Sequence, residues 1–275
     1  MNEDPVLYSK SCQLQISVAT HFLNTYFKLL NVKNNATILD LGAGDASVTL
    51  EALLPRLPNF NKLVVCDKSR NMVNFAKNRF HDERIETVQM DIMDYDKSLK
   101  GYFDHIFSFL CLQQIPEDRT PEALRNIFDM LKPGGNIFAT VIVDVCFYEI
   151  WETMIKEKKW PPAMAGFKSI IPSYRSSDNP REKLMFLLKN AGFDVQVCNY
   201  EKRKFTYDGL NEFMDHSLSI IPILKIGSQD ERTKFLEDFK EAVRKCSLLR
   251  IDSTSDGGQV HYFYSVLVAC ALKPV

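Results

Sequence analysis

The 275-residue sequence has no close grouping of cysteine or histidine. Its five histidines are dispersed, and its seven cysteines form no C-x-x-C pair: Cys12, Cys66, Cys111, Cys146, Cys198, Cys246 and Cys270. Zinc sites and secreted disulfide frameworks need such groupings at short spacing. We therefore expect no metal site. An odd, scattered set of thiols indicates a reducing intracellular compartment.

An excess of basic residues is also missing. Lys and Arg number 34 against 35 for Asp and Glu, which gives a formal net charge of -1. Proteins that bind phosphate backbones usually carry a basic excess or stripe, so we expect no nucleic-acid partner. The short cluster Lys202-Arg203-Lys204 is interpreted as a solvated strand end.

Long apolar runs are absent too, and we expect no membrane span because a bilayer needs about 20 apolar residues in one helix. The segment 1–5 is acidic and polar, unlike a secretory signal. These absences predict a soluble, cytoplasmic protein. They leave the oligomeric state undecided, with a homodimer open.

Strands and helices alternate through the first half of the chain. Strands that are apolar on both faces are typical of a parallel sheet covered by helices on both sides. Beyond residue 144 the alternation breaks into an aromatic-rich segment with further helices and two late strands. We predict one α/β domain, residues 1–275. It divides into a cofactor-binding half at 1–143, a lid and substrate-binding elaboration with late sheet elements at 144–258, and a last strand at 259–272.

One short stretch, residues 37–47, combines a buried strand, the acid Asp40 and the glycine turn Gly42-Ala43-Gly44. A G-x-G turn alone also opens dinucleotide folds, and Asp67 after the second strand suits a ribose in either fold. Asp40 discriminates, because a pyrophosphate would be repelled by a carboxylate at that position. A ligand with a cationic amino group and a sulfonium would be attracted. Asp91, after the third strand, adds a polar group at the same edge.

This combination resembles the class I S-adenosylmethionine-dependent methyltransferases, which implies a Rossmann-like α/β fold. Such a fold has a seven-stranded, mostly parallel sheet with helices on both faces, here with a helical lid elaboration. The resemblance implies S-adenosyl-L-methionine as cofactor, with the turn holding its methionine part, Asp67 its ribose, and Asp91 with Ile92 its adenine. Ala46 stands where the family often has glycine, which is harmless only if its φ is negative. The candidate cofactor-binding residues are Asp40, Gly42, Gly44, Asp67, Lys68, Met72, Asp91, Ile92 and Ser108.

Further stretches resemble the juvenile hormone acid O-methyltransferases of arthropods. They are Leu7-Tyr8-Ser9, Leu14-Gln15, Phe107-Ser108-Phe109, Leu112, Arg125-Asn126-Ile127-Phe128 and Phe263-Tyr264. The resemblance implies methylation of the carboxylate of a sesquiterpenoid such as farnesoic acid or its epoxide, with Gln15 binding that carboxylate. Insect members carry tryptophan where this chain has Gln114, so carboxylate binding is expected to survive while the isoprenoid preference changes. Gln15 and Gln114 are the catalytic candidates.

The chemistry of the acceptor supports a carboxyl group. A carboxylate is already ionised at neutral pH, whereas an alcohol would need a base or a metal. The aromatic segment 147–174 is predicted to cover the acceptor, with Phe147, Trp151, Trp160 and Tyr262 as substrate-binding candidates. Two alternatives stay open: the same fold with another small-molecule acceptor, and a non-catalytic binder of a hydrophobic acid.

Overall fold

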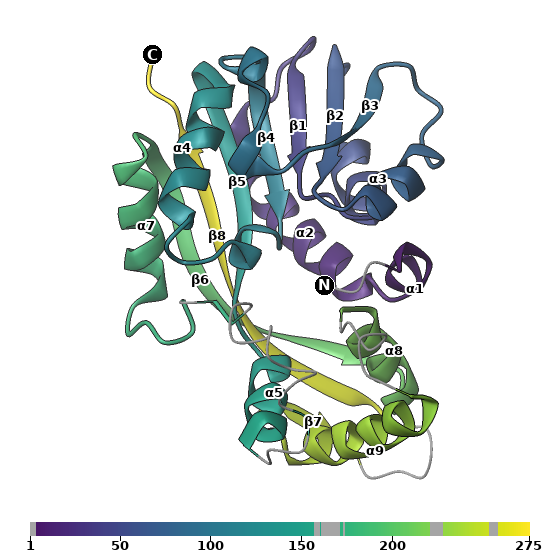
Figure 1. The fold of residues 1–275 in the computed structure, drawn as a ribbon. Coiled ribbons are helices and arrows are strands. Elements are labelled where there is room, and N and C mark those ends of the chain that lie inside the picture. The colour runs from purple at the N-terminus through teal and green to yellow at the C-terminus, as the bar shows by residue number, and fades with distance from the viewer. Residues whose placement is uncertain (1–3, 157–159, 161–170, 173, 221–227, 253–257) are drawn as a thin grey trace.

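The computed structural model describes residues 4–156, 160, 171–172, 174–220, 228–252 and 258–275. A twisted sheet runs through the molecule (Figure 1), with strand order β3-β2-β1-β4-β5-β8-β6. The pairs from β3 to β5 are parallel, and β8 is antiparallel to both of its neighbours. The strands are β1 (Thr37–Leu41), β2 (Lys62–Asp67), β3 (Ile85–Gln89), β4 (Phe103–Phe109), β5 (Leu131–Val145), β6 (Asp194–Tyr207), β7 (Leu249–Ile251) and β8 (Val260–Leu272).

This arrangement confirms the predicted Rossmann-like, mostly parallel sheet of the class I methyltransferases. The expected seven strands form the continuous path. The short strand β7 pairs with β8 outside that path and is an eighth strand that the sequence did not indicate. Its three residues are too few to show a periodic pattern.

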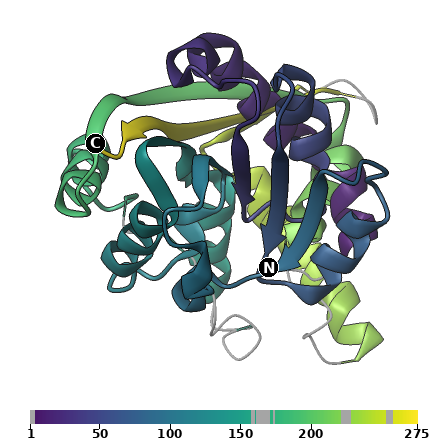
Figure 2. The ribbon, with the colours of Figure 1, turned by 90° about the horizontal axis from the view of Figure 1, so that it is seen from above.

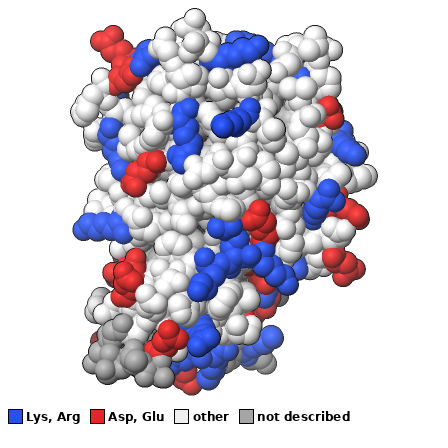
Figure 3. Space-filling view, turned by 180° about the vertical axis from the view of Figure 1, so that it is seen from behind, with Lys and Arg blue, Asp and Glu red and all other residues white. Residues whose placement is uncertain are grey.

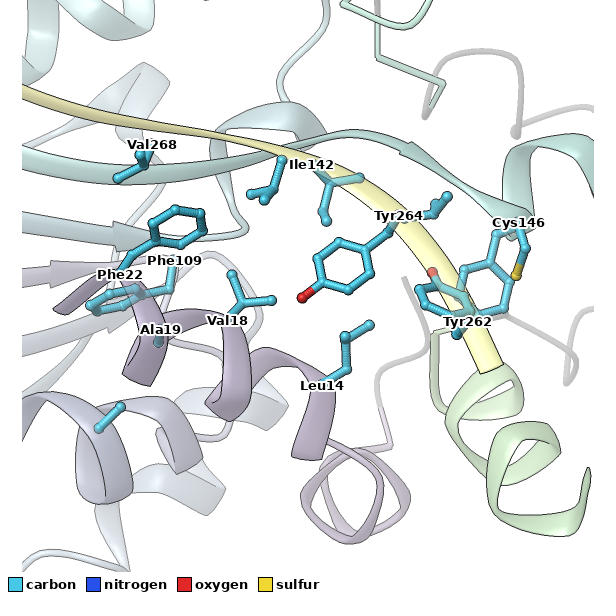
Figure 4. Packing of buried hydrophobic residues seen from close by; sticks show 14 of the residues in the cluster. Leu14, Val18, Ala19, Phe22, Phe109, Ile142, Cys146, Tyr262, Tyr264 and Val268 are labelled. Carbon is cyan, nitrogen blue, oxygen red and sulfur yellow. The ribbon is translucent and has the colours of Figure 1, made fainter. Parts of the chain in front are cut away.

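Helices cover both faces of the sheet (Figure 2). On one face α2 contributes the buried Leu14, Val18 and Phe22, which pack toward the sheet with Phe109, Ile142 and Val268 (Figure 4). On the other face α4 and α7 bury a second apolar cluster against the same strands. The helices are α1 (Pro5–Lys10), α2 (Gln13–Tyr26), α3 (Arg70–Lys77), α4 (Thr120–Met130), α5 (Cys146–Lys156), α7 (Pro180–Asn190), α8 (Leu210–Ile220) and α9 (Gln229–Lys245).

Strands β6 and β8 continue beyond the parallel part of the sheet, and α5, α8 and α9 gather around this extension (Figure 1). Their pairing runs from Asp194 opposite Leu272 to Tyr207 opposite Val260, with one register shift between Val195 and Val197. The sequence predicts a strand over 194–200, and the observed strand is twice that length. Lys202-Arg203-Lys204 lies inside β6, where Arg203 donates hydrogen bonds to Glu201 and His21, and is not a strand end.

Basic and acidic side chains are interspersed over the face shown in Figure 3, with one denser group of basic residues in its lower half. Within the described ranges, no helix is long and apolar enough to cross a bilayer.

Two local features differ from expectation near the glycine turn. The sequence predicts a helix from about Ser47 to Leu54, where Pro55 follows. In the structure this segment contains a π-helical turn, Thr49–Leu53, and Ala46 has a φ of 66°. An alanine in the left-handed region is strained, because its Cβ crowds the backbone. The unpredicted helix α1 begins where the Asp4 carboxylate accepts hydrogen bonds from the amides of Val6 and Leu7.

Candidate active site

The glycine turn lies at the carboxyl end of β1, where ligands of open α/β sheets bind. Gly42 and Gly44 have φ values of 74° and 59°, which favour glycine. The amides of Gly42 and Ala43 both donate to the carbonyl of Cys66, and the Gly44 amide donates to Asp67 Oδ2, each at 2.9 Å. The amides of the turn are thus bound to the end of β2. The turn therefore contributes to ligand binding through its shape, and because glycine has no side chain a ligand can lie close to the backbone.

Among the acids at this edge of the sheet, Asp40 has the most strongly raised pKa. Its side chain is buried, Oδ2 accepts a 2.6 Å hydrogen bond from Thr49, and Oδ1 has no partner in the part of the chain that the structure describes. Burial raises the pKa of Asp40 to about 7, and the nearby charge of Asp67 adds to the rise. A buried carboxylate with an unpaired oxygen favours a ligand that brings a positive charge.

Asp67 and Asp91 follow β2 and β3 at the same edge. Asp67 accepts from the amides of Gly44 and Ser69, one on each oxygen, which leaves lone pairs for hydroxyl donors. Burial raises the pKa of Asp67. Asp91 accepts from the Met93 amide and pairs with Lys68 Nζ at 2.8 Å.

Three further cofactor candidates have mainly structural contacts. Met72 and Ile92 are buried in α3 and in the turn after β3. Ser108 is fully buried, and its hydroxyl donates to the carbonyl of Leu41, which joins β4 to β1 beside the glycine turn.

A cavity opens beside this edge, between α2, α5, α8 and the ends of β5 and β8. About 130 Å³ of it is open to a water-sized sphere. Apolar and aromatic side chains dominate the wall, and none of the lining residues that the structure describes carries a formal charge at neutral pH. They are Tyr8, Leu14, Gln15, Leu110, Gln113, Gln114, Ile142, Val145, Phe147, Tyr148, Trp151, Ile171, His216, Ile220 and Tyr262.

Tyr8 connects the glycine turn to the cavity. Its ring lies 3.7 Å from the position that a Cβ of Gly44 would take, and its hydroxyl is 3.4 Å from Gln15 Nε2. Gln15 is 8% exposed, and its Oε1 lacks a hydrogen-bond partner among the described residues. The predicted residue Gln15 lines the cavity together with Leu14. Its contact with Tyr8, which borders Gly44, puts it at the cavity end nearest the turn.

The two glutamines after β4 differ in exposure. Gln114, the predicted residue, lines the cavity but is exposed. Gln113 is 8% exposed, donates from Nε2 to the Leu110 carbonyl, and leaves Oε1 without a partner in the described structure. Sequence reasoning missed Gln113, Tyr8 and His216. The adjacent Gln-Gln pair was visible, but not which member turns inward.

Three of the four aromatic candidates line the cavity, and the fourth does not. Phe147, Trp151 and Tyr262 line the cavity. Trp160 lies elsewhere: its ring packs edge-on against Phe235 of α9, and its Nε1 donates to Asp238 at 2.7 Å. The middle of the predicted lid, 161–170, lies outside the described residues.

Comparison with known proteins places these features in a family. Residues 38–135 match the family model described as a methyltransferase domain. The chain is 28% identical over 275 residues to a juvenile hormone acid O-methyltransferase of Drosophila melanogaster, covering 97% of this chain and 91% of that one. The same identity over 273 residues relates it to the Bombyx mori enzyme of that name, with 97% and 96% covered.

A solved structure shows the same fold. It is a putative methyltransferase of Bacillus halodurans C-125, with a TM-score of 0.58 and 16% identity over 92% of this chain and 99% of that one. With the buried acids and glycine turn at the sheet edge, these similarities confirm the resemblance inferred from the sequence. Residues 38–135 form a class I methyltransferase domain, for which S-adenosyl-L-methionine is the cofactor, and the chain is similar to the juvenile hormone acid O-methyltransferases along nearly its whole length.

Proposed function

We propose that this methyltransferase esterifies the carboxylate of a small hydrophobic acid, with a sesquiterpenoid such as farnesoic acid or juvenile hormone acid as the leading substrate. The observation that carries the proposal is the cavity beside the glycine turn. Its wall is apolar and aromatic, and the polar groups at the end nearest the turn are the neutral amides of Gln15 and Gln113 and the hydroxyl of Tyr8. The similarity to the two insect enzymes supports the same acceptor class.

The uncharged wall fits a carboxylate for an electrostatic reason. When bound, S-adenosyl-L-methionine supplies a methyl group on a positively charged sulfur. With no formal charge on the described lining residues, a bound carboxylate would have that sulfur as its counter-charge. Attraction between opposite charges is stronger in an apolar site than in water. The acceptor is therefore drawn toward the group it must attack.

In this proposal Gln15 orients the carboxylate. Rotating the side-chain amide by 180° exchanges the positions of Nε2 and Oε1. The Tyr8 hydroxyl then donates to Oε1, and Nε2 becomes a free donor for a ligand in the cavity. That arrangement pairs the acceptor atom left unsatisfied in the apo protein and offers an N–H to the substrate. Holding the acceptor oxygen in line with the methyl group is the main task of such an enzyme, because alignment alone removes a large share of the barrier. No covalent nucleophile is required.

At the other end of the site we assign the cofactor's ammonium group to Asp40, which holds a buried carboxylate oxygen without a partner. Asp67 would accept from the ribose hydroxyls, and the Asp91–Ile92 segment would border the adenine. Gly42 and Gly44 let the backbone turn tightly enough to bring these groups to one edge. Phe147, Trp151 and Tyr262 would enclose the hydrocarbon part of the acid.

The proposal is tested with purified protein, isotopically labelled S-adenosyl-L-methionine and a panel of farnesoic, juvenile hormone, fatty and aromatic acids. We expect methyl esters from the hydrophobic acids. The corresponding alcohols, such as farnesol, serve as matched controls and should stay unmethylated, because the carboxylate supplies its own charge and an alcohol does not. Binding of S-adenosylhomocysteine without ester from any acid would contradict the proposal.

A further inference from the structure

His216 is a polar residue in the cavity wall to which the proposed chemistry assigns no task. It lies on α8 and is 2% exposed. Its Nδ1 is 2.6 Å from the carbonyl oxygen of Ser11, in the segment between α1 and α2. A carbonyl oxygen can only accept a hydrogen bond, so Nδ1 must carry the proton. The tautomer of this ring is thereby fixed.

The second ring nitrogen, Nε2, is left as an acceptor. It has no hydrogen-bond partner among the residues that the structure describes. Burial lowers the pKa of His216 to about 4, so the ring stays neutral at physiological pH and Nε2 does not become a donor. The rings of Phe147 and Tyr207, at centroid distances of 5.8 and 5.6 Å, hold the imidazole in place.

We infer that His216 is a specificity-determining residue of the acceptor cavity, which favours hydrophobic acids that carry a hydroxyl group along the chain. The inference rests on the proposed function and narrows its substrate class: among hydrophobic acids, a chain hydroxyl is favoured over the hydrocarbon chain of farnesoic acid and over the epoxide of juvenile hormone acid. The hydroxyl donates to Nε2, a group that a purely hydrocarbon chain leaves unpaired. Sites built around a buried polar group discriminate strongly against ligands that cannot pair with it.

The same geometry discriminates between kinds of oxygen. An ether or epoxide oxygen is an acceptor, and it would face the lone pair of Nε2 without a proton between them. A hydroxyl has a proton to give. The cavity therefore distinguishes a hydroxy acid from its methyl ether even though both carry oxygen at the same carbon.

The His216 ring is poorly suited to act as a general base. An efficient base has a pKa near the working pH, and burial moves the pKa of His216 well below it. The carboxylate acceptor needs no base in any case. His216 acts on the chain of the substrate and not on its reacting end.

The experiment uses dodecanoic acid, dodecanoic acids with one hydroxyl at a defined carbon, and the methyl ethers of those hydroxy acids. Esterification is measured as kcat/KM with wild-type protein, His216→Phe and Tyr207→Phe. At the carbon that reaches His216, we expect the hydroxyl to raise kcat/KM by about fivefold over the parent acid, the order expected for one net hydrogen bond. The methyl ether should give no gain.

The gain should disappear in His216→Phe and persist in Tyr207→Phe. Tyr207 is the matched control, because its ring contacts His216 but it lies outside the lining residues, and its hydroxyl has no partner in the described structure. If wild-type protein and His216→Phe show the same ratios at every carbon, the inference is wrong while the proposed function stands. If no acid is esterified, both are wrong.

A binding measurement covers the case in which His216→Phe does not fold. In wild-type protein loaded with S-adenosylhomocysteine, the ¹⁵N resonance of His216 Nε2 should shift when the hydroxy acid is added and stay in place with dodecanoic acid. An equal response to both acids would overturn the inference without reference to turnover.

Discussion

Replacing Asp40 by asparagine should stabilise the protein without ligand while weakening its hold on the cofactor. The carboxyl is buried, and burial raises its pKa from the ordinary value of 3.8 to about 7. An acid whose pKa is raised by folding binds more protons in the folded state between those two values. Stability therefore falls as the pH rises through this window. The shift of roughly three pKa units corresponds to a penalty on the order of 4 kcal/mol at alkaline pH.

Asparagine removes the charge but leaves one amide end poorly paired, which costs about 1–3 kcal/mol. We expect a net gain of about 2 kcal/mol in the free energy of unfolding at about pH 8, shrinking toward zero near pH 5, where the wild-type carboxyl is already protonated. Urea unfolding of both proteins at the two pH values measures it. Cofactor affinity moves the other way, with a loss of about thirtyfold or more because a buried charge pair loses one partner.

Asp91→Asn is the matched control for this experiment. Burial works against its charge, but hydrogen bonds from Lys68 and the Met93 amide prevail and lower the pKa of Asp91. Its removal should bring no gain in stability at either pH. If Asp40→Asn gave the same small change in unfolding free energy at both pH values, the raised pKa would be refuted. Wild-type affinity for S-adenosylhomocysteine, measured by calorimetry, would refute the assignment of Asp40 to the cofactor.

Three further substitutions test the acceptor site, with Trp160→Phe as a control outside it. Gln15→Leu should lower kcat/KM for acids by about tenfold or more, since it removes one charge-assisted hydrogen bond. Calorimetry should show unchanged affinity for S-adenosylhomocysteine. Equal losses in kcat/KM and in this affinity would contradict the assignment of Gln15 to the acceptor. Gln114→Trp should alter the relative kcat/KM values among acids more than cofactor affinity, and identical ratios in both proteins would remove this prediction. Trp151→Ala should reduce kcat/KM for long acids. Trp160→Phe should lower the melting temperature by a few degrees at unchanged substrate ratios, because it loses the hydrogen bond to Asp238 and lies outside the cavity wall.

The strands of the parallel part of the sheet were predictable because their physical signals are local. Apolar runs such as 37–41 and 63–67 end in an acid and a turn, which fixes strand boundaries and the carboxyl edge. The length of β6 was not predictable in this way. Its outer half begins with four consecutive charged residues at 201–204, which do not indicate a strand. The whole strand is held by thirteen paired positions on β8, which lies far along the chain.

In the candidate site, too, some residues were predictable from local sequence and others were not. Asp40 and Gln15 could be proposed from their positions beside a glycine turn and on an amphipathic helix. His216 could not, because its significance comes from a hydrogen bond to Ser11, 205 residues away in sequence. Trp160 was placed in the wrong surroundings for a related reason. An aromatic residue in a lid segment looks the same whether it faces a ligand or a neighbouring helix, and only the contact with α9 decides.

The continuous β6–β8 ladder also has a consequence for how ligands enter and leave. The walls formed by α5 and α8 are joined to the parallel sheet by paired strands, so they resist swinging away as a hinged unit. Helix α1 is different: it has six residues, none of them buried, yet its Tyr8 stands between the glycine turn and the cavity. We expect this short helix to be displaced more easily than the walls, and its displacement would open the cavity beside the glycine turn.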